Sequence, residues 1–351
     1  MRWRRILLLD TTAYHPVSPF FVDPLKRLSS QYGWQWMFID EARFFGRVKE
    51  SPVGRISYRF LRRYPGHRAY NRYVEEQAIS FRPHLVLVVK GTYVEPGVLE
   101  RIKKRTGAVL VNYATDDPFN RRVSNPSLVR SIPFYDLYAS TKRAIIGDLQ
   151  HAGTRRAAFV RFGYKPELHF PEVPSCRAES ERFGADVAFI GGCDDDRAPV
   201  FEAMLDALPA LRLALYGGFW NRYSRLRRYW RGHAVGREFR LAACAATITV
   251  NLVRRANRDG HVMRTFELPA CGAFTVSERT DDHEELFRAG QETVYFRTVE
   301  ELIDHVKLYL EQDRERRHIS QRGRNAVLAG HHTYQDRLLE LLHLAEDSVT
   351  S

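Results

Sequence analysis

An arginine and a glutamate lie three residues apart at the start of an expected helix, Arg264 and Glu267. A carboxylate in the first turn of a helix that follows a loop can accept two hydrogen bonds from the vicinal hydroxyls of a ribose. The same carboxylate could instead interact with the helix dipole alone. A guanidinium beside free backbone N–H groups can bind a diphosphate, although Arg264 could also be an ordinary surface arginine. The spacing by itself leaves these alternatives open.

Two glycine pairs, Gly191-Gly192 and Gly217-Gly218, each close an apolar run that is expected to be a strand. Glycine permits tight turns and a close approach of the backbone to phosphate or sugar. Many strands end in glycine, so one such pair is weak evidence, but two in the same half of the chain favour a phosphate-binding edge. Arg197 starts the next expected helix and could neutralise a departing diphosphate.

Two residues of the first half could take a proton from a substrate hydroxyl. Asp116 follows the end of an expected central strand, and His15 follows the first expected strand. Turn chemistry is the alternative, because Thr-Asp-Asp-Pro is a good turn sequence and His15-Pro16 lies in a loop. Between the two candidates we favour Asp116, because a turn after a central strand places it at the carboxyl edge of the sheet.

A possible metal motif, Asp194–Asp196, follows another expected strand. An Asp-x-Asp sequence can hold a divalent cation against a diphosphate, but acidic residues before Arg197-Ala-Pro also suit a loop and a helix N-cap. We favour the N-cap and expect no bound metal and no cofactor. The cysteines are widely spaced and form no Cys-x-x-Cys pair, which indicates buried or idle thiols; they are Cys176, Cys193, Cys244 and Cys271.

These residues belong to a chain in which short apolar runs alternate with longer amphipathic stretches. Helical patterns in the first half include Ala69–Phe81 and Pro96–Arg105. Apolar runs separated by helices imply parallel strands covered on both faces, which is a doubly wound α/β domain. The expected strands of the first half are Ile6–Asp10, Gln35–Ile39, Leu85–Val89, Ala108–Tyr113, Asp136–Ala139 and Ala157–Arg161.

The second half repeats the scheme. Strands are expected at Asp186–Ile190, Leu211–Tyr216, Thr247–Asn251, Ala273–Ser277 and Thr293–Phe296. Helices are expected near Ala198–Leu208, Met263–Cys271, Val299–Gln312 and Arg314–Ala329. Ligands of doubly wound sheets bind at the carboxyl ends of the strands, so two such domains would face a cleft.

The composition fits this architecture and limits the partners. A length of 351 residues suits two domains, and 44% hydrophobic with 27% charged residues is typical of globular proteins. The net charge of +12 favours anionic partners such as nucleotide phosphates, acidic lipid surfaces or nucleic acid. No helix-turn-helix or RNA-recognition signature is present, so no nucleic-acid partner is expected.

No run of about 18 apolar residues occurs, so no membrane span is expected. The apolar run Ile6–Leu9 is too short for a Sec signal, and we expect a cytoplasmic protein. Two stretches rich in arginine and aromatic residues, Arg55–Arg72 and Arg222–Arg231, could contact the anionic inner face of a membrane. They could equally be solvated helix faces.

Several pieces, in their order and spacing, resemble the group 1 glycosyltransferases, specifically the type found in the spore maturation protein CgeB family. The resemblance covers most of the chain and is looser before residue 180. It rests on Arg264-Thr-Phe-Glu-Leu-Pro-Ala-Cys-Gly-Ala-Phe-Thr-Val-Ser277, Glu285-Leu-Phe-Arg-Ala-Gly-Gln-Glu-Thr-Val294, Glu300-Glu-Leu, Arg322-Gly, His332-Thr-Tyr-Gln-Asp-Arg337, Arg82-Pro-His-Leu-Val-Leu-Val-Val-Lys-Gly91, Tyr113-Ala-Thr-Asp-Asp-Pro118, Val187-Ala-Phe-Ile-Gly-Gly192 followed by Arg197, and Tyr216-Gly-Gly-Phe-Trp220.

The resemblance implies the GT-B fold, a nucleotide-sugar donor and no need for metal. It favours ribose binding by Glu267 and diphosphate binding by Arg264, and it adds Asn251 and Thr265 to the donor-binding set. One departure concerns the pair of glutamates that many group 1 enzymes carry eight positions apart. Here Asp259 stands at the first of those positions.

We therefore expect a metal-independent glycosyltransferase of the GT-B fold, with two Rossmann-like domains. Residues 1–165 would form an acceptor-side domain, 166–185 a linker, 186–333 the donor-binding domain, and 334–351 a helix packing back toward the first domain. The acceptor, whether a glycan, a lipid-linked group, a protein or a small molecule, is not indicated by the sequence. The alternative is a two-lobed nucleotide-sugar or glycan binding protein that has lost catalysis.

Overall fold

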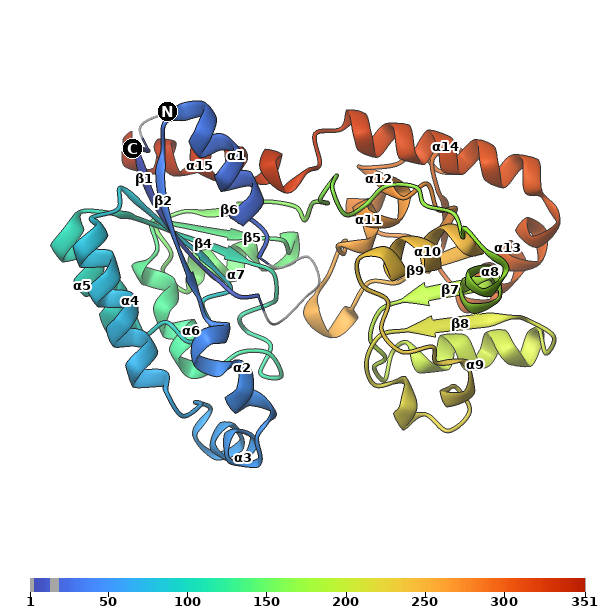
Figure 1. Cartoon of the computed structure of the whole chain (residues 1–351), viewed down its shortest axis with the longest axis horizontal. Coiled ribbons are helices and arrows are strands. Elements are labelled where there is room, and N and C mark those ends of the chain that lie inside the picture. Colours follow the sequence, from blue (N-terminus) through green and yellow to red (C-terminus); the bar gives the residue numbers. More distant parts are fainter. Residues whose placement is uncertain (1–2, 13–18, 351) are drawn as a thin grey trace. The chain divides into compact units, whose positions relative to one another are not determined.

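The computed structural model describes residues 3–12 and 19–350, and the chain divides into two compact units (Figure 1). Unit 1 comprises Met1–Arg161, Ala256–Arg258 and Tyr334–Ser351, and unit 2 comprises Phe162–Arg255 and Asp259–Thr333. Each unit has its own sheet and its own hydrophobic core.

Unit 1 is built on a six-stranded sheet in the order β2-β1-β3-β4-β5-β6, in which all neighbours are parallel. In register, Leu8 lies between Phe38 on one side and Leu87 on the other. β3 is buried along its whole length and β4 along all but its first residue, because helices cover both faces. The strands are β1 (Arg5–Asp10), β2 (Gln35–Asp40), β3 (Leu85–Val89), β4 (Val109–Ala114), β5 (Leu137–Ser140) and β6 (Ala157–Phe159).

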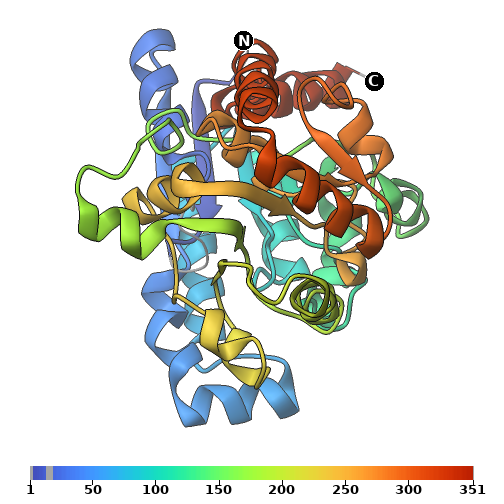
Figure 2. The ribbon, with the colours of Figure 1, turned by 90° about the vertical axis from the view of Figure 1, so that its right-hand side faces the viewer.

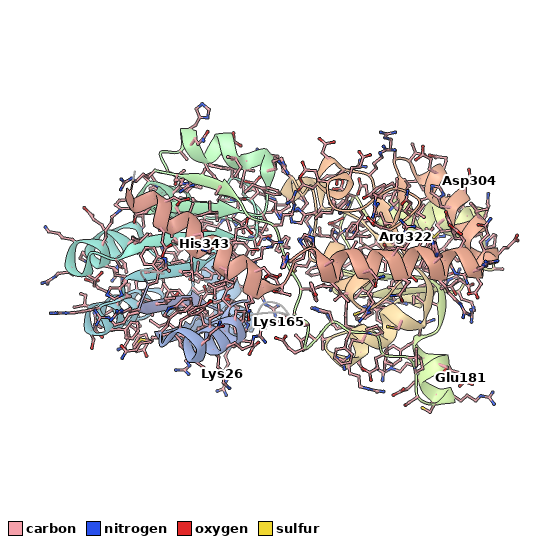
Figure 3. The ribbon with its side chains drawn as sticks, turned by 90° about the horizontal axis from the view of Figure 1, so that it is seen from above. Lys26, Lys165, Glu181, Asp304, Arg322 and His343 are labelled. Atoms are coloured by element: carbon pink, nitrogen blue, oxygen red, sulfur yellow. The ribbon has the colours of Figure 1, made fainter. Side chains whose placement is uncertain are left out.

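The helices of unit 1 include one from the far end of the chain. That helix is held by the indole Nε1 of Trp3, which donates to the carbonyl of Leu342 at 3.1 Å, and by the ring of Tyr334, 4.8 Å from that of Phe20. Figure 3 shows it, carrying His343, beside the helix that carries Lys26. The helices are α1 (Val22–Tyr32), α2 (Ala42–Glu50), α3 (Pro52–Leu61), α4 (His67–Phe81), α5 (Pro96–Thr106), α6 (Pro126–Ser131), α7 (Ile146–His151) and α15 (Tyr334–Thr350).

Unit 2 has a five-stranded parallel sheet in the order β11-β10-β9-β7-β8. Alternate residues of β7 face opposite sides: Val187 packs in the cluster that includes Phe201, whereas Ala188 packs in the cluster that includes Phe239. Both faces are therefore covered by helices (Figures 1 and 2). The strands are β7 (Ala185–Ile190), β8 (Leu213–Tyr216), β9 (Ala246–Asn251), β10 (Thr275–Glu278) and β11 (Val294–Phe296).

The helices of unit 2 are α8 (Arg177–Phe183), α9 (Ala198–Ala207), α10 (Arg237–Ala245), α11 (Arg264–Ala270), α12 (Asp281–Glu284), α13 (Val299–Glu311) and α14 (Asp313–Ala329). With the strands they give two parallel, doubly wound α/β domains, as expected for the GT-B fold. No helix of the described residues combines the length and the apolar content that a bilayer crossing would need.

Two segments lie differently from the expected division. Residues 166–185, expected as a linker, belong to unit 2 and contain α8. Glu172 explains this placement, because its carboxylate contacts Arg237 at 2.5 Å and Arg240 at 2.6 Å and so ties the stretch to α10. Conversely, Ala256–Arg258, from the middle of the second half, belongs to unit 1.

Candidate functional site

The two glycine pairs of unit 2 pack directly against each other at the carboxyl ends of β7 and β8. The N–H of Gly191 donates to the carbonyl of Tyr216 at 2.9 Å, and Cys193 N–H donates to the carbonyl of Gly218 at 2.9 Å. Gly217 has φ +118°, and a Cβ there would stand 2.5 Å from the carbonyl oxygen of Gly191. Glycine is thus required at Gly217 by backbone packing, whatever ligand the edge binds.

Two tryptophans fix these turns. The indole N–H of Trp220 donates to the carbonyl of Gly191 at 2.9 Å, and that of Trp230 donates to the carbonyl of Gly217 at 2.8 Å. Sequence reasoning did not place either tryptophan at this edge. Trp230 belongs to the arginine-rich stretch Arg222–Arg231, so part of that stretch serves the internal structure of unit 2.

Arg197 bridges the ends of two strands. Its guanidinium donates to the carbonyl of Gly192 at 2.9 Å and to that of Leu252 at 3.0 Å, and it lies over the ring of Phe189. Only 7% of the residue is exposed, and burial lowers the pKa of the guanidinium. Arg197 therefore lies at the carboxyl edge and holds the ends of β7 and β9 together there.

Arg264 and Glu267 form an ion pair with each other. The Nε of Arg264 also donates to the carbonyl of Ile190 at 2.7 Å, and its guanidinium lies over the ring of Phe239. Glu267 is completely buried, and its Oε1 is 3.7 Å from Nε2 of His169. Burial lowers the pKa of His169. For the carboxylate of Glu267 to reach a ribose, it would have to separate from Arg264.

Asn251 and Thr265 are joined in a buried hydrogen-bond network. The Asn251 amide donates to Thr265 Oγ1 at 3.3 Å, and Thr265 Oγ1 is 2.8 Å from His283 Nε2. The other ring nitrogen of His283 lies 2.7 Å from the carbonyl of Glu278, and burial lowers the pKa of this histidine. The Asn251 Oδ1 atom is buried without a hydrogen-bond partner among the described residues. Such an oxygen is a ready acceptor for a ligand hydroxyl.

A buried histidine that sequence reasoning missed stands just before α11. His261 Nδ1 is 2.8 Å from Asp282 Oδ2, and its Nε2 accepts from the N–H of Phe162 at 3.0 Å. Both ring nitrogens are thus engaged, so His261 positions the loop that leads into α11. The Asp-Gly-His sequence before the helix is the only local signal that could have pointed to it.

The aspartate run Asp194–Asp196 makes the contacts of a loop, but it does not supply the expected N-cap of α9, because Arg197 occupies that position without a side-chain cap. Asp194 accepts from the N–H of Arg197 at 3.1 Å and lies 3.4 Å from Nε of Arg254, while Asp195 accepts from the Tyr223 hydroxyl at 3.0 Å. In residues 3–12 and 19–350, no three His, Cys, Asp or Glu side chains are arranged to hold a metal ion. Asp259 is half-buried and interacts electrostatically with Arg197.

In unit 1, Asp116 lies just beyond the carboxyl end of β4. Its Oδ2 is 2.7 Å from Nζ of Lys90, and its Oδ1 accepts from Asn257 at 3.3 Å. Its neighbour Asp117 is buried and holds Arg258 through two contacts of 2.7 and 3.1 Å. Asp116 thus keeps a partly exposed carboxylate, whereas Asp117 anchors the Ala256–Arg258 segment.

A second acid–base pair lies at the end of β2. Glu41 is buried and contacts Lys49 Nζ at 2.9 Å, and this ammonium lies 4.7 Å from the ring centre of Tyr93. Burial raises the pKa of Glu41 to about 8 and lowers the pKa of Lys49 to about 7. Sequence reasoning missed this pair. The other base candidate, His15, lies outside the described residues.

Comparison with known proteins bears on the fold and the class of enzyme. The model of a family described as "Glycosyl transferase-like" matches residues 197–343. No curated protein matches this chain significantly. Among solved structures, a sucrose-phosphate synthase from Thermosynechococcus elongatus is 10% identical, with a TM-score of 0.68 over 99% of each chain.

Two further structures cover nearly the whole chain. An α,α-trehalose-phosphate synthase from Burkholderia vietnamiensis is 12% identical, with a TM-score of 0.63 over 99% of this chain and 100% of that one. HepE from Anabaena, in complex with UDP and glucose, is 13% identical, with a TM-score of 0.61 over 99% of this chain and 100% of that one. At these identities the likeness shows the fold, and the expected GT-B architecture is confirmed. With the family match, the expectation of a glycosyltransferase is confirmed as well.

Proposed function

Starting from a glycosyl transferase-like domain in a GT-B fold, we propose that this protein transfers a sugar from a nucleoside-diphosphate-sugar donor to an acceptor hydroxyl without metal. The observation that carries the proposal is the carboxyl edge of the unit 2 sheet. There Arg197 and Arg264 bond to strand-end carbonyls beside the packed glycine turns, and Asn251 offers an unpartnered buried oxygen. The resemblance in the sequence supports the CgeB-like type.

The chemistry requires cations at this edge. In glycosyl transfer the bond from the sugar C1 to the diphosphate oxygen breaks, the acceptor oxygen bonds to C1 and its proton leaves. Negative charge grows on the departing diphosphate, and fixed cations stabilise that charge without reorganisation. Arg197 is fixed by two backbone carbonyls, and Arg264 by Ile190. Metal would then be unnecessary.

The proposed class of donor rests on the ligands of structurally similar proteins. Structures of HepE were solved with UDP, with UDP-glucose, and with UDP and glucose. By analogy, the donor of this protein is a nucleotide sugar, with the ribose near Glu267 and the diphosphate near Arg264. In the structure these two side chains pair, so donor binding would exchange the Arg264–Glu267 contact for contacts to the ligand.

The acceptor side is assigned to unit 1. Asp116 is the proposed general base, oriented by Lys90 and Asn257. The acceptor class stays open among glycans, lipid-linked groups, proteins and small molecules. Peripheral contact with an anionic membrane is a separate proposal and does not depend on the donor.

Calorimetry with a nucleoside, a nucleoside diphosphate and a nucleotide sugar tests the donor site, once a thermal-shift screen has identified the base. Glu267→Ala should weaken all three, because each hydrogen bond to a charged group contributes roughly 1.5–3 kcal/mol. Arg264→Ala should weaken the two charged ligands and spare the nucleoside. It should also slow turnover, because charge on the diphosphate grows in the transition state.

Arg212→Ala is the matched control, since this arginine pairs with Asp186 at the opposite, amino edge of the same sheet. It should leave all three titrations unchanged. Wild-type binding of all three ligands by Glu267→Ala would show that the donor site lies elsewhere. Donor binding with neither hydrolysis nor transfer would favour the alternative, a binding protein without catalysis.

A further inference from the structure

Helix α3 of unit 1 presents an exposed apolar face. Val53, Ile56, Phe60 and Leu61 have exposed fractions of 66%, 59%, 76% and 69%. Among the described residues, no other helix carries more than one exposed large hydrophobic side chain. Single exposed apolar residues are ordinary, but four on ten residues form a patch of the kind that marks an interaction surface.

The exposure follows from how α3 is held. Ser51 caps the helix by accepting from the N–H of Gly54 at 3.0 Å, and Pro52 occupies the first turn. Gly54 is buried, and a Cβ at this position would lie only 1.8 Å from the carbonyl oxygen of Val48. The ring of Tyr58, on the same helix, stacks on the ring of Tyr64. This inner face fixes the rotation of the helix about its axis.

The fixed inner face leaves the apolar side chains pointing outward. Val53, Ile56 and Phe60 follow the spacing of three, then four residues that places side chains along one helix face. Figure 1 shows α3 at one extremity of unit 1, beyond α2 and the end of α4.

The charge around this face is positive. Arg55 and Arg59 lie on the helix, Arg62 and Arg63 follow it, and all four are exposed. The sequence of α3, Pro52–Leu61, contains no acidic residue. Arginine can extend its charged end to lipid phosphates while its aliphatic part lies against apolar surface. An apolar face rimmed by arginine therefore complements the interface of a bilayer that contains anionic lipid.

The second arginine-rich stretch is different. In Arg222–Arg231, Arg225 pairs with Asp206, Arg231 donates to the carbonyls of Arg182 and Gly184, and Trp230 holds a glycine turn. Its buried and bonded side chains belong to the structure of unit 2. The two stretches look alike in the sequence, but only the first combines arginine with an exposed apolar face.

We propose that α3 docks this protein on the surface of an anionic lipid bilayer, with Val53, Ile56, Phe60 and Leu61 entering the interface and the neighbouring arginines contacting lipid phosphates. The proposal does not rest on the donor chemistry. It supplies a function for the exposed face, and it would bring the protein to acceptors that lie at a membrane.

Flotation of the full-length protein with vesicles tests the proposal. Vesicles of phosphatidylcholine alone are compared with vesicles containing phosphatidylglycerol, at low and at high salt. The wild type should bind the anionic vesicles at low salt, bind the neutral ones more weakly, and dissociate as salt rises. The double variant Ile56→Asp/Phe60→Asp should reduce the partition coefficient at least about tenfold, because burying one large apolar side chain contributes roughly that factor.

Two further variants separate docking from general effects. Arg59→Glu/Arg62→Glu should also reduce binding, through charge alone. Val173→Asp replaces an isolated residue of unit 2 that is 73% exposed, and it should bind as the wild type does. Nucleotide-sugar binding by calorimetry without vesicles should be the same in all these proteins, so loss of lipid binding can be told from loss of the donor site.

Three outcomes would overturn the proposal. The first is equal binding to neutral and anionic vesicles, or no binding to either, by the wild type. The second is unchanged binding by the double aspartate variant. The third is light scattering that shows a dimer without lipid, which the double variant converts to a monomer, together with no vesicle binding. That result would assign the face to a second copy of the chain.

Discussion

The carboxyl edges of the two sheets share a topology but differ in charge. In unit 2, Arg197 donates to two backbone carbonyls, and Arg264 donates to the carbonyl of Ile190 while also pairing with the buried Glu267. In unit 1, Lys90 pairs with the carboxylate of Asp116, and Lys49 contacts Glu41, a buried acid whose pKa is raised to about 8. The fold supplies an edge, and the side chains decide its chemistry. The cations of unit 2 suit a polyanionic ligand, and the paired groups of unit 1 suit proton transfer.

The largest expected effect tests whether the unit 2 edge depends on backbone packing. Gly217→Ala should destabilise unit 2 by roughly 3 kcal/mol or more, because it combines a strained φ with a collision between the new Cβ and the carbonyl of Gly191. Urea unfolding followed by tryptophan fluorescence measures this, since Trp220 and Trp230 both contact the turns.

Gly218→Ala is the matched control for that substitution. A Cβ at Gly218 would meet only the His233 ring at 3.9 Å, an ordinary contact. The change should therefore cost about 1 kcal/mol or less. Equal losses of unfolding free energy in the two variants would mean that backbone packing does not require glycine at Gly217 more than at Gly218.

The next effect concerns proton transfer at the unit 1 edge. Asp116→Asn should lower turnover by about 100-fold or more if the carboxylate takes the acceptor proton, while donor affinity changes little. Steady-state kinetics and donor titration separate the two quantities. Asp117→Asn should act mainly on stability, because Asp117 is buried against Arg258. A fully active Asp116→Asn protein would show that Asp116 is not the general base and that another group takes the acceptor proton.

Local sequence signals predicted the strands and about half of the helices of the described residues. Each of the eleven strands that the described residues form lies within a few residues of its expected position, because buried parallel strands are continuous apolar runs that can be recognised without the rest of the chain. Helices α9, α11, α13 and α14 also begin within one residue of expectation. Short helices such as α8 and α10 were not predicted.

The contacts of the site could not be predicted in the same way. His261 pairs with Asp282 and accepts from Phe162, whose backbone lies 99 positions earlier in the chain. Asp117 and Arg258 are 141 positions apart. Such pairs depend on the tertiary arrangement of loops, and that arrangement leaves no periodic pattern in the amino-acid sequence. Even the local pair Arg264 and Glu267 was expected to bind separate parts of a ligand, whereas the structure joins them.

A smaller effect, on pH dependence, tests the buried pair of unit 1. The pKa of Glu41 is raised to about 8, so its stabilising contribution is complete below its ordinary value of 4.5 and is lost as pH rises through 8. Lys49, with a pKa lowered to about 7, contributes a pH dependence of opposite sign above pH 7. The range from pH 5 to 7 therefore isolates Glu41.

The measurement compares the wild type with Glu41→Gln. The difference in unfolding free energy between the two proteins should shrink with rising pH, by up to about 1.4 kcal/mol per pH unit. Attraction from the Lys90 ammonium reduces this slope. A difference that is flat from pH 5 to 7 would show that Glu41 is ionised throughout, and that the unit 1 edge carries a permanent ion pair.

The smallest effect is expected from metal removal, because EDTA should leave donor turnover unchanged. Asp194 already accepts from the N–H of Arg197 and contacts Arg254, and Asp195 accepts from Tyr223, so a divalent cation on these carboxylates would have to displace those contacts. The charge that a metal would bring to the diphosphate is proposed to come from Arg197 and Arg264 instead. Activity is measured after dialysis against EDTA and again after adding Mn²⁺ or Mg²⁺. Loss of turnover that either ion restores would place a cation at the unit 2 edge, and its arginines would then act with a metal rather than in its place.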